Sequence, residues 1–501
     1  MTTNNKVIPQ YNSSSSASSI SSSTISIVSE RSSLLSYKKN TLDTTYKIEL
    51  KWLTINSLPI ILTYVLQNSF QLTSIYFLGH LGSIELGASA LGSMFANVSA
   101  FSISLGAATA LDSLMTQAWS GATDKTLLGV HLQRSILILS LLLIPISIVW
   151  LNVTSLLLFL KQDQQIAEYT GLYLRYLLFG VPPYIYFEVF KKFLQAQGIM
   201  QASTYCLLIV APINIVLNYL YIHQFHMGFI GAPLATSCSY WLMFLLLLIY
   251  IFVLGNGKAA FGQWQKECLK EWSPFLRLAF FGVLTVVTEW VAFEIVSLAA
   301  SYLGSVDLAA QSILITLSSL TYTIPYGLSV AVANRVGNAL GEANGQKASC
   351  ATKVSLGFAV LLSVINSAVI LLFQDKVAYL FTTEKEVIQL VAAVLPLCAL
   401  FQLTDSLANT CAGVIRSLGR QHISAKINLI AYYFVALPLG YYLTFTREWG
   451  LYGLWSALAV ALFLCALGQA INLYLVDWDY EAHKAHHRVK KEEEVLLYLP
   501  N

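Results

Sequence analysis

The segment Leu81-Gly-Ser-Ile-Glu-Leu86 recurs 222 residues later as Leu303-Gly-Ser-Val-Asp-Leu308. Two further pairs of segments keep nearly the same spacing, namely Gly228-Phe-Ile-Gly231 with Gly450-Leu-Tyr-Gly453, and Leu194-Gln-Ala-Gln-Gly198 with Ile415-Arg-Ser-Leu-Gly419. Three matches in the same order and almost the same register indicate a duplicated unit, because chance rarely repeats one offset. The chain is therefore expected to consist of two related halves.

The composition indicates that both halves are embedded in a lipid membrane. Of the 501 residues, 56% are hydrophobic and 11% are charged, whereas an ordinary soluble domain carries roughly 25% charged residues. The net charge of +3 is too small to suggest nucleic-acid binding, and the sequence contains no phosphate-binding G-x-x-x-x-G-K-[ST] motif. The seven cysteines are scattered singly, so we expect reduced thiols and no metal site or other cofactor.

Apolar runs long enough to cross a hydrocarbon core of about 30 Å recur along the whole chain after residue 52. We expect helices, since lipid offers the backbone no hydrogen-bonding partner. Twelve spans are predicted, at residues 54–78, 88–118, 128–152, 165–197, 201–223, 229–253, 275–300, 308–340, 348–374, 387–418, 422–446 and 450–476.

The duplication sets the symmetry of these spans. Because six crossings return the chain to its starting side, both halves have the same orientation, and two parallel six-helix lobes with a cleft between them are expected. The predicted domains are a disordered Ser-rich tail (1–50), an N-lobe (51–254), a linker (255–274), a C-lobe (275–476) and a charged, solvated tail (477–501).

The basic residues predict the orientation in the membrane. Of the 29 Lys and Arg residues, 24 lie in the two tails, in the loops after the even-numbered spans, or in the span ends beside those loops. Cytoplasmic loops retain such residues, so both termini and the linker are predicted to be cytoplasmic. The sequence does not distinguish the plasma membrane from the vacuolar membrane.

Five acidic residues lie well inside the predicted spans, away from their outer ends, and ionised groups are costly there. Asp112 and Glu188 are interpreted as structural charges. Asp112 is expected to pair with a nearby basic residue such as Arg134. Glu188 precedes Lys191 and Lys192 by three and four residues, a spacing that suits a salt bridge on one helix.

The other three acids, Glu289, Glu294 and Asp405, have no basic residue nearby in their own spans. An unpaired carboxyl group in an apolar site can exchange protons near physiological pH, which a proton-coupled carrier needs. Glu289 corresponds to Gln67 in the first half at the offset of 222, so the two lobes differ in chemistry. Glu289 and Asp405, with Glu294, are therefore the predicted proton- and substrate-coupling residues.

Polar and aromatic residues near these acids are candidates for the walls of a substrate cavity. Aromatic faces can hold an organic cation by cation–π contact, although ordinary helix packing is the alternative for each ring. The candidates are Gln67, Asn68, Trp290, Phe293, Tyr322, Tyr326 and Asn409.

Several motifs together resemble the eukaryotic branch of the multidrug and toxic compound extrusion (MATE) family, from about residue 50 to 476. They are Gly79-His-Leu-Gly-Ser-Ile-Glu-Leu86, Ala110-Leu-Asp-Ser113, Gln117-Ala118, His131-Leu-Gln-Arg134, Phe193-Leu-Gln-Ala-Gln-Gly198, Ala310-Gln-Ser312 and Arg335-Val-Gly-Asn-Ala-Leu-Gly341.

The resemblance implies a V of two six-helix lobes that exports organic cations or other xenobiotics in exchange for protons, rather than sodium, as a monomer. The family's Glu-Trp glutamate corresponds to Glu289, the acid of plant-like members to Asp405, and the second glutamate of animal-type members to Glu294. Two positions depart from the family. The first-lobe aspartate of many bacterial members is Gln67, and a glutamate of animal members corresponds to Thr316.

The sequence thus predicts a secondary active antiporter in which protonation of Glu289, with Asp405 as the second acid, competes with cation binding. A lipid-linked flippase of the same superfamily would need a cationic groove, and the cleft-forming spans offer almost no Lys or Arg. A membrane-embedded enzyme would need clustered catalytic residues, whereas the histidines are dispersed. A channel is a further alternative. Saturable counterflow in proteoliposomes would indicate a carrier, because a channel does not show it.

Overall fold

The computed structural model describes residues 16–255 and 257–497. Helices and short connections account for all of these residues, and no β-strand occurs in the described ranges. The chain divides into two compact units, Met1–Lys51 and Trp52–Asn501. The predicted all-α class is confirmed, as expected for a chain whose backbone must satisfy its own hydrogen bonds in lipid.

The first helix, α1 (Ser16–Gly79), begins far upstream of the predicted first span. The sequence predicted disorder over residues 1–50, but residues 16–50 are helical. Residues 1–15 of the predicted tail lie outside the described residues. Nucleating a helix is costly while extending one is not, so the apolar part of α1 can support the serine-rich turns that precede it.

The N-lobe continues from the part of α1 after Trp52. Its elements are α2 (Ser83–Ala96), the π-helix η1 (Asn97–Phe101), α3 (Ser102–Ala108), α4 (Leu111–Gly121), α5 (Leu127–Leu151), α6 (Val153–Phe159), α7 (Gln164–Leu178), α8 (Val181–Ala196), α9 (Ala202–Tyr219), η2 (Leu220–Gln224), η3 (Gly228–Ile230), α10 (Gly231–Leu248) and η4 (Ile249–Val253). The linker then contains α11 (Lys258–Phe261) and η5 (Lys266–Leu269).

The C-lobe repeats this arrangement. Its elements are α12 (Trp272–Ser301), α13 (Ser305–Gly341), α14 (Gly345–Leu372), α15 (Gln374–Val377), η6 (Ala378–Leu380), α16 (Lys385–Ser417), α17 (Gln421–Leu429), η7 (Ile430–Ala436), α18 (Leu437–Tyr441), η8 (Tyr442–Thr446) and α19 (Leu451–Tyr474). The last helix is α20 (Trp478–Leu497).

Ten helical stretches within the described residues are long and apolar enough to cross a membrane. The other two predicted spans are the apolar part of α1 and the pair α7 and α8, which is divided just before Pro182-Pro183. A proline is well tolerated in a first helical turn but not in the turns behind it, so the division falls there. The twelve-helix prediction is confirmed, with most boundaries within a few residues.

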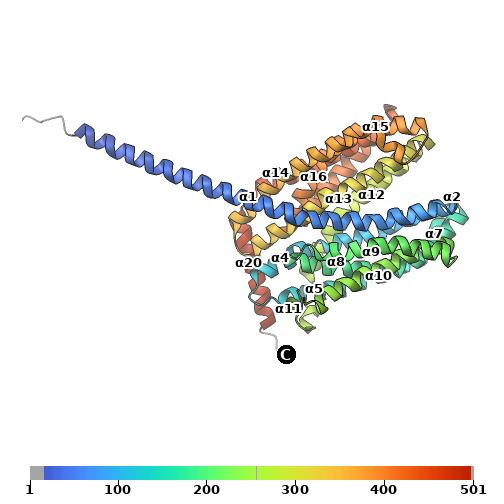
Figure 1. Ribbon diagram of the computed structural model, residues 1–501, viewed down its shortest axis with the longest axis horizontal. Helices are drawn as coiled ribbons and strands as arrows, with labels where there is room; N and C mark the ends of the chain where they lie inside the picture. Colours follow the sequence, from blue (N-terminus) through green and yellow to red (C-terminus); the bar gives the residue numbers. More distant parts are fainter. Residues whose placement is uncertain (1–15, 256, 498–501) are drawn as a thin grey trace, which may run out of the picture. The chain divides into compact units, whose positions relative to one another are not determined.

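Each lobe has its own apolar core. Large buried side chains of the N-lobe core include Phe70, Trp150 and Phe187, and those of the C-lobe core include Tyr432 and Trp455. In Figure 1 the green helices α8 and α10 lie together, as do the orange helices α14 and α16, and each of these pairs is in contact. The lobes meet where α3 packs against α12 and α4 packs against α13.

Glycines allow the closest approach between the lobes. A Cβ atom on Gly106 of α3 would lie 2.5 Å from the Cα atom of Val283 on α12, and Gly282 packs against the same turn of α3. At the other contact, a Cβ atom on Gly121 of α4 would lie 2.8 Å from the carbonyl oxygen of Gly341 on α13. Small residues let helix backbones approach in this way in membrane proteins.

The C-terminal helix α20 is not the solvated tail that the sequence predicted. Figure 1 shows α20 in red, and it contacts α13 and α14 of the C-lobe as well as α4 of the N-lobe. Its buried stripe consists of Ala482, Ala485 and Val489, which recur at helical spacing. The helix therefore connects the two lobes, and we call this side of the unit the α20 end.

Candidate functional site

Two acidic residues of the C-lobe lie close to one another. Glu289 lies on α12 and is half-buried, whereas Asp405 on α16 is 1% exposed. Their carboxyl groups are near enough to interact electrostatically, and each also interacts with Tyr322 and Tyr432. Helices that are far apart in sequence thus bring together two of the acids predicted as coupling residues.

The surroundings of Asp405 leave part of its carboxyl group unpaired. Its Oδ1 atom accepts a hydrogen bond of 2.8 Å from Asn409 Nδ2, one turn further along α16. Its Oδ2 atom is buried and has no hydrogen-bonding partner among the described residues. Within the described part of the chain neither Asp405 nor Glu289 forms a salt bridge. Two acidic groups without a paired cation are thus concentrated in one region of the C-lobe.

The third predicted acid is placed differently. Glu294 is half-buried on α12, five residues beyond Glu289. At a helical repeat of 3.6 residues, this spacing places the two side chains on different faces of α12. The electrostatic interactions that join Glu289 to Asp405 do not include Glu294.

Four aromatic side chains gather near the acids, where the lobes face one another. The rings of Tyr322 and Tyr326 are stacked, with centroids 5.5 Å apart and an interplanar angle of 24°. Tyr64 of α1 meets Tyr326 edge-on at 4.8 Å, and Trp290 packs against the same cluster. The predicted aromatics Trp290, Tyr322 and Tyr326 therefore do come together.

Phe293 does not join this aromatic cluster. Its ring meets that of Phe401 edge-on at 5.9 Å, and it packs against the core of the C-lobe. Ordinary helix packing, which the sequence left open for every ring, is the role observed for Phe293.

The predicted N-lobe candidates are engaged by polar neighbours. Gln67 Nε2 donates to Glu188 Oε1 at 2.9 Å, and Lys191 Nζ donates to the same oxygen at 2.6 Å. The predicted salt bridge between Glu188 and Lys191 is therefore present, and it is almost fully buried. Asn68 Nδ2 donates to the carbonyl oxygen of Ser319 on α13 at 3.5 Å.

Asp112 has partners that the sequence did not predict. The expected partner was Arg134, but Asp112 Oδ1 accepts from Lys192 Nζ at 2.6 Å and Oδ2 accepts from Arg416 Nε at 3.0 Å. Arg416 lies on α16 in the opposite lobe, where it is 8% exposed. The sequence analysis counted Arg416 among the basic residues of a cytoplasmic loop. Its position inside a long apolar span could have indicated that it is buried and paired.

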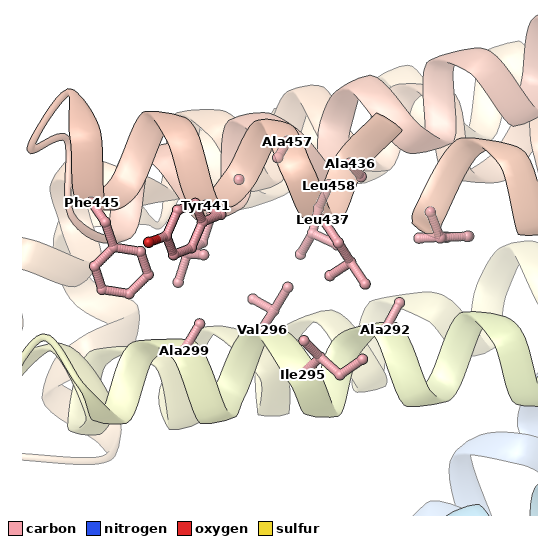
Figure 2. A pocket seen from close by; sticks show the side chains of 13 residues that line it. Ala292, Ile295, Val296, Ala299, Ala436, Leu437, Tyr441, Phe445, Ala457 and Leu458 are labelled. Atoms are coloured by element: carbon pink, nitrogen blue, oxygen red, sulfur yellow. The ribbon is translucent and has the colours of Figure 1, made fainter. Parts of the chain in front are cut away.

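A cavity of about 250 Å³ lies within the C-lobe. Figure 2 shows α12 on one side of this cavity, with Ala292, Val296 and Ala299 pointing toward Leu437, Tyr441 and Ala457. The lining is almost entirely apolar, and it includes none of the residues predicted as substrate contacts. Tyr432 lines the cavity and also interacts electrostatically with Glu289 and Asp405, neither of which lines it.

Comparison with known proteins gives matches along most of the chain. The MatE family model matches twice, over residues 59–220 and 282–442, once in each lobe. The chain is 40% identical to a transporter of Schizosaccharomyces pombe, covering 84% of this chain and 78% of that protein. It is 37% identical to human Multidrug and toxin extrusion protein 1 (85% and 75% covered) and 35% identical to Protein DETOXIFICATION 16 of Arabidopsis thaliana (87% and 90% covered).

Solved structures agree with these sequence matches. The eukaryotic MATE transporter AtDTX14 superposes with a TM-score of 0.85 at 28% identity, covering 89% of this chain and 100% of that chain. The Vibrio cholerae MATE transporter VcmN, in its bent form, shares the fold at 16% identity with a TM-score of 0.73, covering 90% of this chain and 99% of that chain. Repeat, fold and sequence therefore lead to one conclusion, that this chain belongs to the eukaryotic branch of the multidrug and toxic compound extrusion (MATE) family of membrane transporters.

Proposed function

We propose that this transporter is a secondary active antiporter that exports organic cations or other xenobiotics in exchange for protons. The observation that carries the proposal is the pair of Glu289 and Asp405, two acids for which the described residues supply no salt bridge. An ionised carboxylate inside a membrane is costly unless a cation compensates its charge. A proton and an organic cation both supply that compensation, so they compete for the same two groups.

The aromatic cluster supports an organic cation as the cargo. The faces of Tyr322, Tyr326 and Trp290 lie near the acidic pair, and such faces attract organic cations by cation–π contact. The human and plant relatives are named for multidrug extrusion and detoxification. Sodium attracts the same carboxylates, and the imposed pH and sodium gradients of the experiment below distinguish the two ions.

The contact between the lobes supports alternating access. If both termini are cytoplasmic, as the basic residues predict, the α20 end faces the cytoplasm. The lobes meet there through α4 and α13, so the described conformation is closed on that side. Export then requires the lobes to separate at the α20 end for loading and to rejoin before release on the outer side.

The alternatives are less well supported. The three buried cations near the lobe contact, Lys191, Lys192 and Arg416, each pair with a carboxylate, so none offers a free charge to the phosphate of a lipid-linked flippase substrate. The family and its solved members are transporters, which argues against a membrane-embedded enzyme. The plasma membrane and the vacuolar membrane both fit the proposal.

The proposal is tested by counterflow of radiolabelled tetraethylammonium into proteoliposomes under imposed pH or sodium gradients. We expect the wild-type chain to respond to the pH gradient and the Glu289→Gln variant to lose this response. A matched control is Glu386→Gln, which removes an exposed acid from the first turn of α16. Proton-driven uptake by Glu289→Gln at the wild-type rate would refute the proposed role of this acid.

A further inference from the structure

Asp112 is a buried carboxylate shared by the two lobes. Its Oδ1 atom binds Lys192 of its own lobe at 2.6 Å, and its Oδ2 atom binds Arg416 of the C-lobe at 3.0 Å. The side chain of Asp112 is 1% exposed and that of Arg416 is 10% exposed. Gln117 Nε2 on α4 adds a second bond across the same contact, to the carbonyl oxygen of Ser417 at 2.7 Å. When the lobes separate, Asp112 keeps Lys192, whereas Arg416 loses its carboxylate.

Hydrogen bonds and the covalent frame of Asn409 together link Arg416 to Asp405. Arg416 Nη2 donates to Ser329 Oγ at 2.7 Å, and the Ser329 hydroxyl donates to the carbonyl oxygen of Asn409 at 2.6 Å. Asn409 Nδ2 then donates to Asp405 Oδ1 at 2.8 Å. Ser329 is completely buried, and it joins α13 to two turns of α16. The acid of the candidate site and the bond between the lobes are therefore parts of one network.

A small cavity lies beside Arg416. Its volume of about 20 Å³ suits a single water molecule. The lining includes Thr109 of the N-lobe and Thr285, which is one helical turn before Glu289 on α12. Gln421 and Ser424 also line it, and each has a buried polar atom without a partner among the described residues. Polar groups of both lobes therefore lie beside the guanidinium group of Arg416.

The charge of Asp405 contributes to the strength of this network, and Glu289 of α12 is a second acid that interacts with both Asp405 and Arg416. A hydrogen bond to an ionised carboxylate is roughly twice as strong as one between neutral groups. An ionised Asp405 therefore holds the side chain of Asn409 firmly and steadies this turn of α16. The main-chain carbonyl of Asn409 anchors Ser329, which in turn holds the guanidinium group that binds Asp112. A proton or an organic cation on Asp405 neutralises the carboxylate and weakens its bond to Asn409.

We propose that Arg416, positioned by Ser329 and Asn409, is a charge-sensitive lock between the lobes that holds while Asp405 is ionised and empty and is released when Asp405 carries a proton or an organic cation. Such a lock hinders the empty carrier from leaving the described conformation, so this half of the exchange requires a counter-ion. The inference rests on the proposed antiport, but the lock itself can be observed without any transport.

The test follows hydrogen exchange of the full chain in lipid nanodiscs by mass spectrometry, read at the backbone amides of α4 (Leu111–Gly121). This helix lies in the N-lobe and packs against α13 of the C-lobe, so its exchange reports the contact between the lobes. In the wild-type chain we expect tetraethylammonium, or the substitution Asp405→Asn, to speed exchange in α4 about tenfold. In Ser329→Ala we expect fast exchange from the start and no further response to either change.

Ser355→Ala is the matched control, because Ser355 is an equally buried C-lobe serine whose described hydrogen bond stays within its own helix, to Thr352. It should respond as the wild-type chain does. Arg416→Lys keeps the positive charge and should retain part of the response. A wild-type response in Ser329→Ala, or no response to Asp405→Asn in the wild-type background, would overturn the lock.

Transport separates this inference from the proposed function. With the lock broken, Ser329→Ala should release tetraethylammonium from proteoliposomes without a proton gradient about tenfold faster than Ser355→Ala does. Equal release by the two variants, together with proton-driven uptake by the wild-type chain, would overturn the lock and leave the antiport standing. Absence of proton-driven uptake by the wild-type chain would overturn the antiport, whatever the exchange of α4 shows.

Discussion

Buried charges in this transporter fall into two groups, and the difference lies in their immediate partners. Glu188 with Lys191, and Asp112 with Lys192 and Arg416, form nearly dry ion pairs. Among the described residues Asp405 has only the amide of Asn409, and its second oxygen has no partner. A buried ion pair satisfies its own charges, so the unpaired acids are the ones available to a proton or a cargo.

The sequence identified the unpaired acids but not the whole paired network. Glu188 and Lys191 share a helix, so their spacing predicted the salt bridge. Asp112 and Arg416 are 304 residues apart, and only packing of the lobes brings them together. Local spacing carries no information about such a pair, which is why Arg134 was the wrong partner.

A single methyl group at the lobe contact should destabilise the protein. In Gly106→Ala the added Cβ atom would lie 2.5 Å from the backbone of α12, which cannot move as a side chain does. We expect a loss of about 1–3 kcal/mol, as for other overpacked contacts, visible as a lower unfolding temperature in detergent.

Gly357→Ala is the matched control, because a Cβ atom at Gly357 of α14 meets nothing within 4 Å. This control should be neutral or stabilising by up to about 1 kcal/mol, since alanine favours helices over glycine. Equal unfolding temperatures for the two variants would show that the contact at Gly106 is looser than described.

At the scale of elements, α20 shows where composition misleads. Its Lys, Glu and His residues predicted a solvated tail, yet Glu481 and Glu493 are among its buried residues. The apolar stripe of Ala482, Ala485 and Val489 is narrow, and the charged residues around it find partners on both lobes. Arg488 Nη2, for example, donates to Gln117 Oε1 on α4 at 2.6 Å. Those partners exist only once the lobes have folded.

Acid should release α20 from the N-lobe. Burial alone would raise the pKa of Glu492, but its hydrogen bond with His131, at 3.2 Å, and the charge of Arg488 lower that pKa below the ordinary value of 4.5. A carboxyl group whose pKa is lowered by folding stabilises the folded state fully at a pH above its ordinary pKa. This stabilisation is lost as the pH falls through the lowered pKa of the folded protein. Proteolysis of α20 should therefore increase as the pH falls below 4.5.

Glu492→Gln should weaken this docking at neutral pH by about 1–3 kcal/mol. The neighbouring exposed Glu494 provides the control, because Glu494→Gln removes the same charge from the solvent side of α20. Equal proteolysis of the two variants would argue against the contact with His131.

At the scale of the whole molecule, exchange of one proton for one monovalent cation moves no net charge. We therefore expect transport that follows the pH gradient and ignores the membrane potential. A gradient of one pH unit then supplies about 1.4 kcal/mol, which supports roughly a tenfold ratio of cation concentrations. Uptake into proteoliposomes with potassium diffusion potentials of either sign measures this, and a dependence on the potential would show a different stoichiometry.

The sequence alone determined the twelve helices, their division into two lobes and the acids that lack a local cation. These features follow from hydrophobic length, from the repeat and from spacing along single helices, all of which are local or periodic. The tertiary structure decided which distant residues meet, namely Glu289 with Asp405, Asp112 with Arg416, and α20 with both lobes. Such contacts depend on the angles and positions at which helices pack against one another. Local sequence is compatible with many such arrangements, and close packing at glycines and pairing of buried charges select one of them.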